Sequence, residues 1–595
     1  MSSTVLSRRD LEFLLYEWLN VETLTGRPRF GDHSRETLDA VLDLAENLAL
    51  RYFEPHYQAS DRIEPVFDGE RVAILPEIGE ALGAFGATGM LGGAADVELG
   101  GVQLPEVVLR AAFLWLQAAN IATASYPMLT MGNANLLCAY GTPEQVDTFV
   151  RPMFEGRFFG TMCLSEPQAG SSLADILTVA VPEGEGQYRV TGSKMWISGG
   201  DHEMSENIIH LVLARTPDAP RGVKGLSLFI VPKFLVGSDG AVGERNDVAL
   251  AGINHKMGYR GTVNTFLSFG SGRHCPGGSA GAVGHLVGEE GRGLEYMFHM
   301  MNEARIAVGA GAAAVGYTGY LRALDYARSR IQGRDAGTRD PGSPPVPIVR
   351  HADVRRMLLA AKSYVEGAQA LVLFAARLLD EQRTADDEGD RARAGLLLDV
   401  LTPVVKSWPS QWCLRANDLA IQVLGGYGYA REYPLEQLYR DNRLNMIHEG
   451  THGIQALDLL GRKVRLANGA GLSILTERIA ATLTRAAVPF PEYARALAGA
   501  WEGVTSVTET LWASDRPRES LAHATPYLET FGHVVVAWIW LEQLLATVGK
   551  TGDFYDAKRA AARFFFTYEL PSVGPTLDFL ALADPFLADL DEAWL

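Results

Sequence analysis

The stretch FFGTMCLSEP (158–167) through QYRVTGSKMWISGG (187–200) decides the fold, because the texture of the sequence changes there. It contains short runs rich in β-branched and aromatic residues. Similar runs follow in IIHLVLART (208–216), LSLFIVPKF (226–234) and NTFLSFG (264–270). Glycine and polar turns separate these runs, which is typical of antiparallel strands. Residues 161–283 are therefore predicted to form a mainly antiparallel β domain.

Helical patterns flank this β domain on both sides. Residues 1–160 contain apolar residues at helical spacing, as in LDAVLDLAENLALRYF after the capping residue Ser34, and a helix start at Thr142-Pro143-Glu144. Residues 284–468 contain four helical segments that predict an antiparallel bundle. A glycine-containing linker leads into an additional helical domain, 469–595. The predicted class is α+β, in the order helical domain, β domain, four-helix bundle and extra helical domain.

Composition narrows the class of function. The 595 residues carry a net charge of −18, which disfavours binding to nucleic acid or an anionic membrane. The four cysteines are far apart, a reduced intracellular pattern. The N-terminal segment lacks the features of a secretory signal. We therefore expect a cytoplasmic enzyme.

Three loop segments could contact a ligand. LSEPQAGS (164–171) offers hydroxyls and exposed backbone donors, although the segment taken alone is better explained as an ordinary connection between strands. In KMWISGG (194–200), Trp196 and Ser198 would share one side of a strand, although a tryptophan there could simply be part of the core. LGGYG (424–428) lacks the spacing of a dinucleotide fingerprint, but its glycines would let a backbone approach a ligand.

The order of several motifs resembles the acyl-CoA dehydrogenase family across about residues 30–465. These motifs are LSEPQAGS, GSKMWISGG, HKMGYRGT, NEARIAVGAGA, RSRIQGR, QVLGGYGYAREYPLEQLYRD and HEGTHGIQ. The tail beyond residue 470, with PYLETFGHVVVAWIWLEQ, is similar to the extra helical domain of a large-subunit branch that includes the 3-methylmercaptopropionyl-CoA dehydrogenases. Such a domain could cover the bundle and leave the protein a dimer.

The resemblance implies FAD-dependent conversion of an acyl-CoA thioester to the trans-2-enoyl-CoA. A carboxylate removes the α-proton, and the β-hydrogen leaves as hydride to flavin N5. An acyl-CoA substrate, an electron-transfer flavoprotein as acceptor and a homodimer are implied in the same way.

The resemblance also assigns roles to individual positions. Glu449 matches the catalytic base. The positions that match FAD contacts, some of them across the dimer, are Ser165, Trp196, Ser198, Arg330, Gln332, Gln422, Gly425, Gly426, Thr451 and Gly453. The positions that match the acyl-CoA side are Ser171, Arg305 and Gly450.

The chain departs from the family pattern at three places. His448 stands where many members have tyrosine, so the resemblance implies a pocket of different polarity at this position. Gln168 replaces a usual glycine, and RIQGR (330–334) lacks the usual aromatic residue, which puts individual contacts in doubt.

Other functions were weighed against this one. His448-Glu449-x-x-His452 matches the zinc motif H-E-x-x-H, but that motif needs one continuous helix, which Gly450 disfavours. Thr451 is better placed as the N-cap of the following helix. A DNA-binding flavoprotein of this fold would want a basic tail, whereas residues 469–595 have 9 Lys+Arg against 16 Asp+Glu. An oxygen-using acyl-CoA oxidase remains open, because no motif reports oxygen access. The acyl chain is likewise open.

Overall fold

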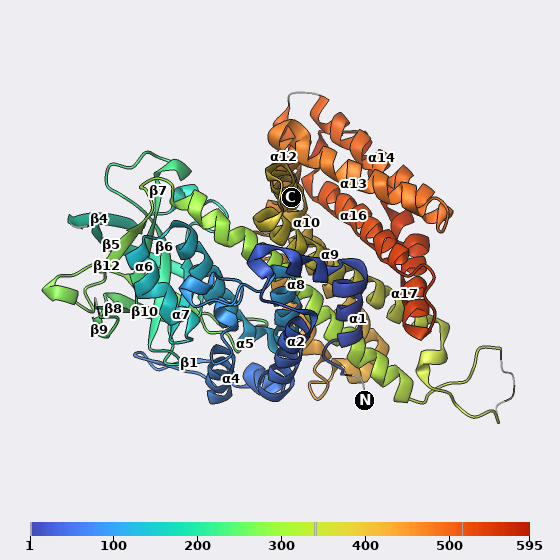
Figure 1. Cartoon of the computed structure of the whole chain (residues 1–595), viewed down its shortest axis with the longest axis horizontal. Helices are drawn as coiled ribbons and strands as arrows, with labels where there is room; N and C mark the ends of the chain where they lie inside the picture. The colour runs from blue at the N-terminus through green and yellow to red at the C-terminus, as the bar shows by residue number, and fades with distance from the viewer. Residues whose placement is uncertain (1–2, 185, 238, 338–339, 341, 514–515) are drawn as a thin grey trace. The chain divides into compact units, whose positions relative to one another are not determined.

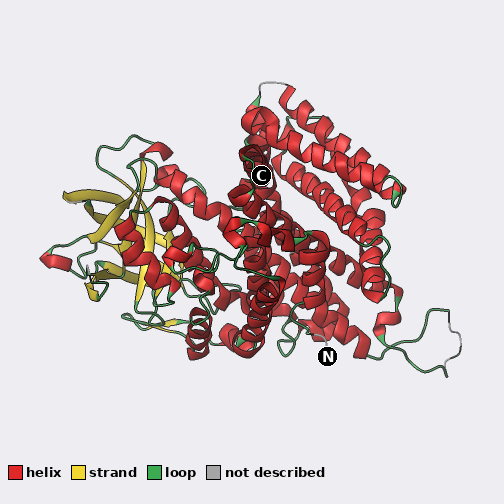
Figure 2. Cartoon of the chain, in the orientation of Figure 1, coloured by secondary structure: helices red, strands yellow, loops and turns green. Residues whose placement is uncertain are grey.

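A computed structural model describes the chain apart from residues 1–2, 185, 238, 338–339, 341 and 514–515. Figure 1 traces the chain from its N-terminus in blue to its C-terminus in red. The chain divides into two compact units. One consists of 39–104 and 119–304, and we call it the sheet unit. The other consists of 1–38, 105–118 and 305–595, and we call it the helical unit. Figure 2 shows that the large sheet lies among the elements of the sheet unit.

The predicted β domain is confirmed as one eight-stranded sheet. Its strand order is β10-β11-β5-β12-β7-β6-β3, with β4 paired to β5 and β6. Most pairs are antiparallel, whereas β3 pairs with β6 in parallel, a detail that the strand texture alone did not reveal. The strands are β3 (Phe158–Cys163), β4 (Val179–Gly184), β5 (Gln187–Ser198), β6 (Asn207–Arg215), β7 (Leu226–Pro232), β10 (Val248–Ile253), β11 (Asn264–Phe269) and β12 (Ala282–Val287).

Helices before the sheet complete this unit. α4 (Pro76–Gly86) contributes Ile78 and Leu82 to the apolar core that the sheet also lines. α5 (Glu106–Tyr140) is bent at Asn120, and its later part adds Tyr126 to the same core. A two-stranded hairpin of β1 (Val66–Phe67) and β2 (Val72–Ala73) interrupts the region that we expected to be helical throughout.

The predicted bundle helices form within the helical unit. α9 (Ala352–Thr384) and α10 (Glu388–Leu424) pack along one another, and α8 (Gly293–Ser329) enters this unit from Arg305 onward. α11 (Leu435–Arg443) and α12 (His452–Gly461) pack against α10. α12 has only ten residues and is shorter than a full bundle helix.

The tail folds onto the bundle helices, as expected for a covering domain. Its helices are α13 (Ala470–Ala486), α14 (Pro491–Ala513), α16 (Ala524–Ala546), α17 (Asp553–Phe564) and α18 (Val573–Ala581). α16 packs against α9, α10 and α12, and α17 packs against α9 (Figure 1). The run Val534–Leu541 of α16 is buried at every position, so the helix serves as the core of the tail.

A cluster of buried charges joins the first helix of the helical unit to the tail. The Lys558 ammonium of α17 contacts the Asp10 carboxylate at 2.5 Å and the Glu366 carboxylate of α9 at 2.9 Å. Lys362 pairs with Glu366 from one helical turn away. The side chains of Asp10, Glu366 and Lys558 are at most 2% exposed. Asp10 belongs to α1 (Arg8–Glu12), so the two ends of the chain meet here.

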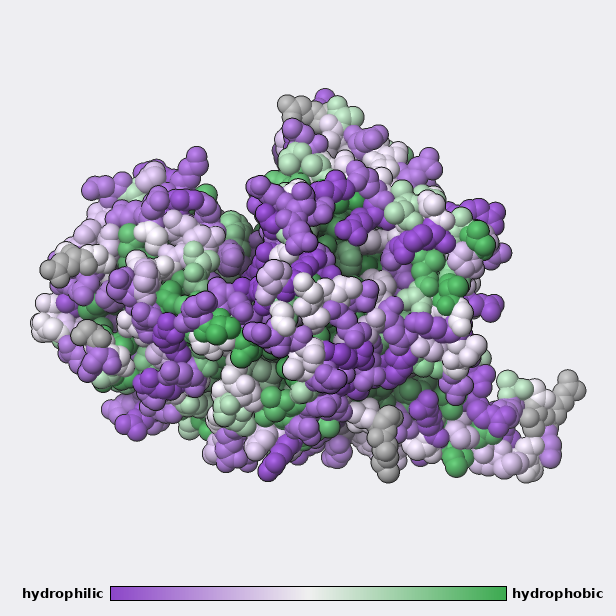
Figure 3. Space-filling model, viewed as in Figure 1, coloured by the Kyte–Doolittle hydropathy of each residue, from purple (hydrophilic) through white to green (hydrophobic). Residues whose placement is uncertain are grey.

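Two helices, α5 and α9, are long and apolar enough to match a membrane span by composition. Their apolar windows are 94% and 83% buried inside the protein, as in core helices. The face of the molecule in Figure 3 is mostly polar, with apolar groups scattered among charged ones. The apolar residues of α5 and α9 are therefore explained by their burial in the protein interior.

Candidate active site

Glu449 lies in a strained loop directly before α12. Glu449 has φ = 54° and Gly450 has φ = 87°, two consecutive left-handed residues. A non-glycine residue in this region costs about 1–2 kcal/mol, and such strain gathers at functional sites. Thr451 ends the loop as the N-cap, because its hydroxyl accepts a hydrogen bond from the Ile454 N–H at 3.4 Å. The predicted cap is confirmed.

Two side chains hold the carbonyl oxygens of this loop. The Gln455 side-chain amide donates to the Glu449 carbonyl oxygen at 3.0 Å. The Lys406 ammonium of α10 donates to the Gly450 carbonyl oxygen at 2.7 Å. Gln455 and Lys406 are both fully buried. The strained backbone is thus fixed from two different helices.

The Glu449 side chain is half-buried, so it keeps some access to solvent while protein surrounds most of it. Burial raises the pKa of Glu449 above its ordinary value, and the Arg305 and Lys406 cations offset this only in part. Burial likewise lowers the pKa of Lys406 to about 7, against the attraction of Glu449. Arg305 is buried and pairs with Asp458 of α12 at 3.1 Å. Glu449 is therefore a carboxylate with raised basicity among cations.

The two histidines of the H-E-x-x-H pattern do not share a helical face. His448 precedes α12, and its ring nitrogen bonds the Asn445 side-chain oxygen at 3.0 Å. His452 is the first residue of α12, and its ring lies 3.4 Å from the Glu529 carboxylate of α16. Burial lowers the pKa of His448 to about 3, so this ring is neutral near pH 7. The geometry required by the zinc motif does not form.

A second group of predicted positions gathers where α8 and α10 end. The Arg330 guanidinium lies 5.5 Å from the centre of the Tyr427 ring and donates to the Gln332 side chain at 3.3 Å. Tyr427 belongs to the turn Gly425–Tyr429 that follows α10. A Cβ atom added at Gly425 or Gly426 would meet no protein atom within 4 Å. Gln422 is exposed beside them. The turn and the Arg330 loop thus form one accessible surface.

The loop after β3 is pinned by a buried ion pair. The Lys194 ammonium contacts the Glu166 carboxylate at 2.9 Å, and their side chains are 0% and 3% exposed. Glu166 also accepts hydrogen bonds from the backbone N–H groups of Leu177 and Thr178. Ser165 is partly exposed, and its carbonyl oxygen accepts the Met195 N–H at 2.9 Å. The pinned loop holds Ser165 against β5, whereas Ser171 lies exposed at its far end.

Trp196 stands at a bulge in β5. The register with β11 shifts between Thr265 and Leu267, and Trp196 has φ = 65°. Its side chain is 60% exposed, which is unusual for so large an apolar ring. The next residue, Ile197, is buried. Ser198 after it is partly exposed, and its hydroxyl accepts a hydrogen bond from the Asn264 side-chain amide at 3.2 Å. Trp196 and Ser198 are therefore both on the more accessible side of β5.

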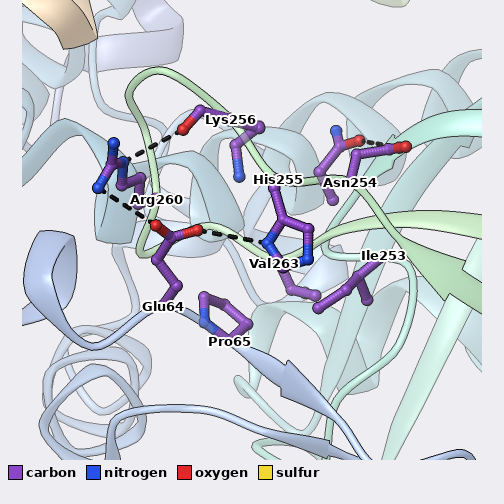
Figure 4. A pocket seen from close by; sticks show the side chains of 9 residues that line it. Glu64, Pro65, Ile253, Asn254, His255, Lys256, Arg260 and Val263 are labelled. Carbon is purple, nitrogen blue, oxygen red and sulfur yellow. Dashed lines mark hydrogen bonds and ion pairs between the residues drawn. The ribbon is translucent and has the colours of Figure 1, made fainter.

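The motif HKMGYRGT lines a small pocket of the sheet unit close to Ser198. Figure 4 shows Glu64 between His255 and Arg260, at 3.5 and 3.2 Å. Asn264, the partner of Ser198, also lines this pocket. Its space is about 200 Å³, and this value includes the part that is open to solvent. It could admit only part of a larger ligand.

These features fit an FAD cofactor. Trp196 offers an exposed flat ring, with the Ser198 hydroxyl on the same side of the strand. Gly425, Gly426 and Gly453 leave open space at the positions where a phosphate or adenosine backbone would approach. The N–H groups at the start of α12 form a site suited to an anion.

Sequence reasoning missed four residues that hold the site: Glu166, Lys194, Lys406 and Gln455. Lys194 is a charged residue inside the predicted strand run QYRVTGSKMWIS, Glu166 follows the apolar run FFGTMCL, and Lys406 interrupts the apolar run LTPVVKSWP. A charge inside a buried pattern signals a specific partner. Because these partners lie up to 44 residues away in the chain, the sequence did not identify them.

Three family models match the chain. They are described as acyl-CoA dehydrogenase, middle domain (residues 161–270), acyl-CoA dehydrogenase, C-terminal domain (291–464), and acetyl-CoA dehydrogenase C-terminal like (475–591).

Relatives and solved structures agree with these matches. The chain is 39% identical to a 3-methylmercaptopropionyl-CoA dehydrogenase of Ruegeria pomeroyi, over 79% of each protein. It is 34% identical to the broad-specificity linear acyl-CoA dehydrogenase FadE5 of Mycobacterium tuberculosis, over 98% of each. The structure of an acyl-CoA dehydrogenase complexed with FAD from Bacillus anthracis matches with a TM-score of 0.75 at 18% identity. That match covers 96% of this chain and 92% of the other.

Proposed function

Because the chain belongs to the acyl-CoA dehydrogenase family and is an FAD-dependent acyl-CoA dehydrogenase, we propose that Glu449 is the base that removes the α-proton of the thioester. The product would be the trans-2-enoyl-CoA. One observation carries the proposal: Glu449 is a strained, partly accessible carboxylate whose pKa burial raises.

The raised pKa makes Glu449 a stronger base than a carboxylate in water. A general base works best when its pKa is near the working pH. Only the deprotonated form can take the proton, so the rate falls as the pH drops through the pKa of Glu449. The Arg305 and Lys406 cations moderate this rise in the pKa of Glu449.

The backbone of the same loop can stabilise the developing charge. Among the described residues, no acceptor is hydrogen-bonded to the Glu449 N–H. This donor could bind the thioester carbonyl oxygen as negative charge develops on it. Oxyanion donors of this kind typically contribute about 3–4 kcal/mol to lowering the barrier.

Bound FAD supplies the redox chemistry by accepting the β-hydrogen as hydride. Within the sheet unit, Ser165, Trp196 and Ser198 would hold the flavin ring. Within the helical unit, the Arg330 loop and the Gly425 turn would hold a cofactor, which the family resemblance assigns to a partner subunit. Thr451 and Gly453 would lie at the phosphates. Ser171, Arg305 and Gly450 would face the acyl-CoA.

The substrate we propose is an unbranched acyl-CoA. Both relatives named above act on unbranched acyl groups according to their names. We further propose a homodimer with an electron-transfer flavoprotein as acceptor. Unbranched acyl-CoAs of different chain lengths should reduce the flavin under anaerobic conditions, and the branched isobutyryl-CoA should react far more slowly. Peroxide formed in air without an added acceptor would indicate an oxidase instead.

The replacement Glu449→Gln tests the base. The variant should retain FAD, seen in its visible absorption, because the change is isosteric and removes only the basic group. Anaerobic bleaching by acyl-CoA should slow at least about 100-fold, the lower range of general-base contributions. The wild-type protein with the same thioester is the control, and bleaching at the wild-type rate would place the base elsewhere.

A further inference from the structure

The loop that carries Glu449 is held by two buried side chains, one of which comes from a distant part of the sequence. Glu449 and Gly450 are both left-handed, and each carbonyl oxygen is bonded by a buried side chain. Gln455 comes from α12, the helix that directly follows the loop. Lys406 comes from α10, and it lies 44 residues before Gly450 in the chain. A lysine at 0% exposure in an apolar helix is costly unless its charge has a specific partner.

We propose that Lys406 is a positioning residue for Glu449: its ammonium group fixes the Gly450 carbonyl and places a cation beside the base. This inference rests on the proposed function of Glu449. The bond to the Gly450 carbonyl fixes the peptide plane between Gly450 and Thr451. It thereby helps to hold the left-handed backbone of Gly450, the residue next to Glu449. Misplacement of a reacting group by about 1 Å can cost about 100-fold in rate.

The charged groups around the base define what Lys406 adds. Arg305 of α8 faces Glu449 as a second cation, but Asp458 of α12 already pairs with it. Arg462, directly after α12, acts on Arg305, and the neighbouring His448 is neutral. Lys406 faces Glu449 and Arg305 and is bonded to a neutral carbonyl. Among the residues that the structure describes, no carboxylate other than the base therefore offsets the charge of Lys406.

The direction of the pH effect follows from these contacts. Burial raises the pKa of Glu449, and the Lys406 cation lowers it. Lys406 carries its charge below its own pKa of about 7, and in that range its removal raises the pKa of Glu449 further. The acidic limb of the rate profile should then move to higher pH, by roughly one unit for an adjacent charge. A residue that only fills space would leave this limb in place.

The experiment compares Lys406→Met and Lys406→Gln in the FAD-loaded enzyme. Methionine removes both the hydrogen bond and the charge, whereas glutamine retains a donor for Gly450 without the charge. Lys463→Met is the matched control, because Lys463 is 3% exposed and pairs with Asp399 instead. FAD content, thermal melting, the anaerobic bleaching rate against pH, and infrared titration of the protonated Glu449 carboxyl are measured.

We expect Lys406→Met to keep FAD and to bleach at least about tenfold more slowly. The infrared midpoint of Glu449, identified by its absence in Glu449→Gln, should rise in both Lys406 variants. Lys406→Gln should recover part of the rate, and Lys463→Met should match the wild type. If Lys406→Met does not fold, the infrared titration midpoint of Glu449 in Lys406→Gln alone tests the role of Lys406.

Two results would overturn the inference in distinguishable ways. An unmoved infrared midpoint and a wild-type rate in the Lys406 variants, with an inactive Glu449→Gln, would refute the role of Lys406 alone. Wild-type bleaching in Glu449→Gln would refute the proposed function and the inference together.

Discussion

At the scale of single residues, the site combines backbone strain with side-chain anchors. Glu449 occupies a conformation that side chains rarely adopt, and Gly450 continues it. Gln455 bonds the Glu449 carbonyl at 3.0 Å, so the strained conformation has a defined partner. The base is therefore preorganised before a substrate arrives.

The replacement Gly450→Ala should damage both stability and chemistry. Its φ of 87° disfavours alanine, and the new Cβ would lie 2.5 Å from the Gln455 amide nitrogen. We expect the free energy of unfolding to fall by about 1–2 kcal/mol, and bleaching to slow because Gln455 must release Glu449. Chemical denaturation and anaerobic kinetics measure both effects.

Gly453→Ala is the comparison, since its Cβ meets no protein atom within 4 Å. It should leave stability unchanged or slightly higher while weakening FAD binding. Equal stability losses at both glycines would contradict the argument from local strain.

At the scale of elements, the buried pair Glu166–Lys194 connects the β3 loop to β5. Burial alone would raise the pKa of Glu166, but Lys194 and the hydrogen bonds from Leu177 and Thr178 lower it to about 2. Because the folded-state pKa of Glu166 lies below its unfolded value, the ionised Glu166 carboxylate stabilises the fold above about pH 4.5. This contribution is lost as the pH falls from about 4.5 toward 2. Burial lowers the pKa of Lys194, so burying this cation offsets part of the gain.

Glu166→Gln should therefore lower stability at pH 7 by about 3–5 kcal/mol, because Lys194 remains buried without its counter-ion. The stability of the variant should also change less with pH below about 4.5 than that of the wild type. Acid and urea denaturation measure these effects. The double variant Glu166→Gln/Lys194→Met is the control and should regain part of the loss; purely additive losses would argue against coupling.

How much the sequence predicts depends on the range of the interactions. The strand texture, the Thr451 cap and the start at Thr142 are local patterns, and the structure confirms them. The parallel pairing of β3 with β6 and the bulge at Trp196 depend on partners distant in the chain, so local periodicity does not report them. For the same reason Lys406 was missed as a neighbour of Gly450. The roles assigned by family resemblance stay predictions.

At the scale of the whole chain, the tail belongs to the helical unit rather than standing apart. α16 packs on α12, the helix that begins just after the base, and Glu529 of α16 approaches His452. The charge cluster around Lys558 further ties α17 to α9 and to α1.

Lys558→Met should lower the free energy of unfolding by about 3–5 kcal/mol, because Asp10 and Glu366 would be left as buried anions with less compensation. Lys550→Met is the matched control, since Lys550 is 34% exposed and pairs with Glu17 near the surface. Its cost should be under about 1 kcal/mol. Similar melting temperatures for the two variants would contradict a structural role for the buried cluster.

The meeting of Asp10 with Lys558 has a consequence for the order of synthesis. The ribosome releases the first helix long before α17 exists, and the contacts of α1 with α17 span 546 residues of chain, as from Arg9 to Tyr555. At about 5–20 residues per second, the wait is on the order of a minute. Throughout that time burial of the Asp10 carboxylate costs free energy without compensation, because its counter-ion Lys558 has not yet been translated. α1 should therefore be among the segments that fold late, and a chaperone that shields nascent chains would find α1 exposed until α17 has been translated.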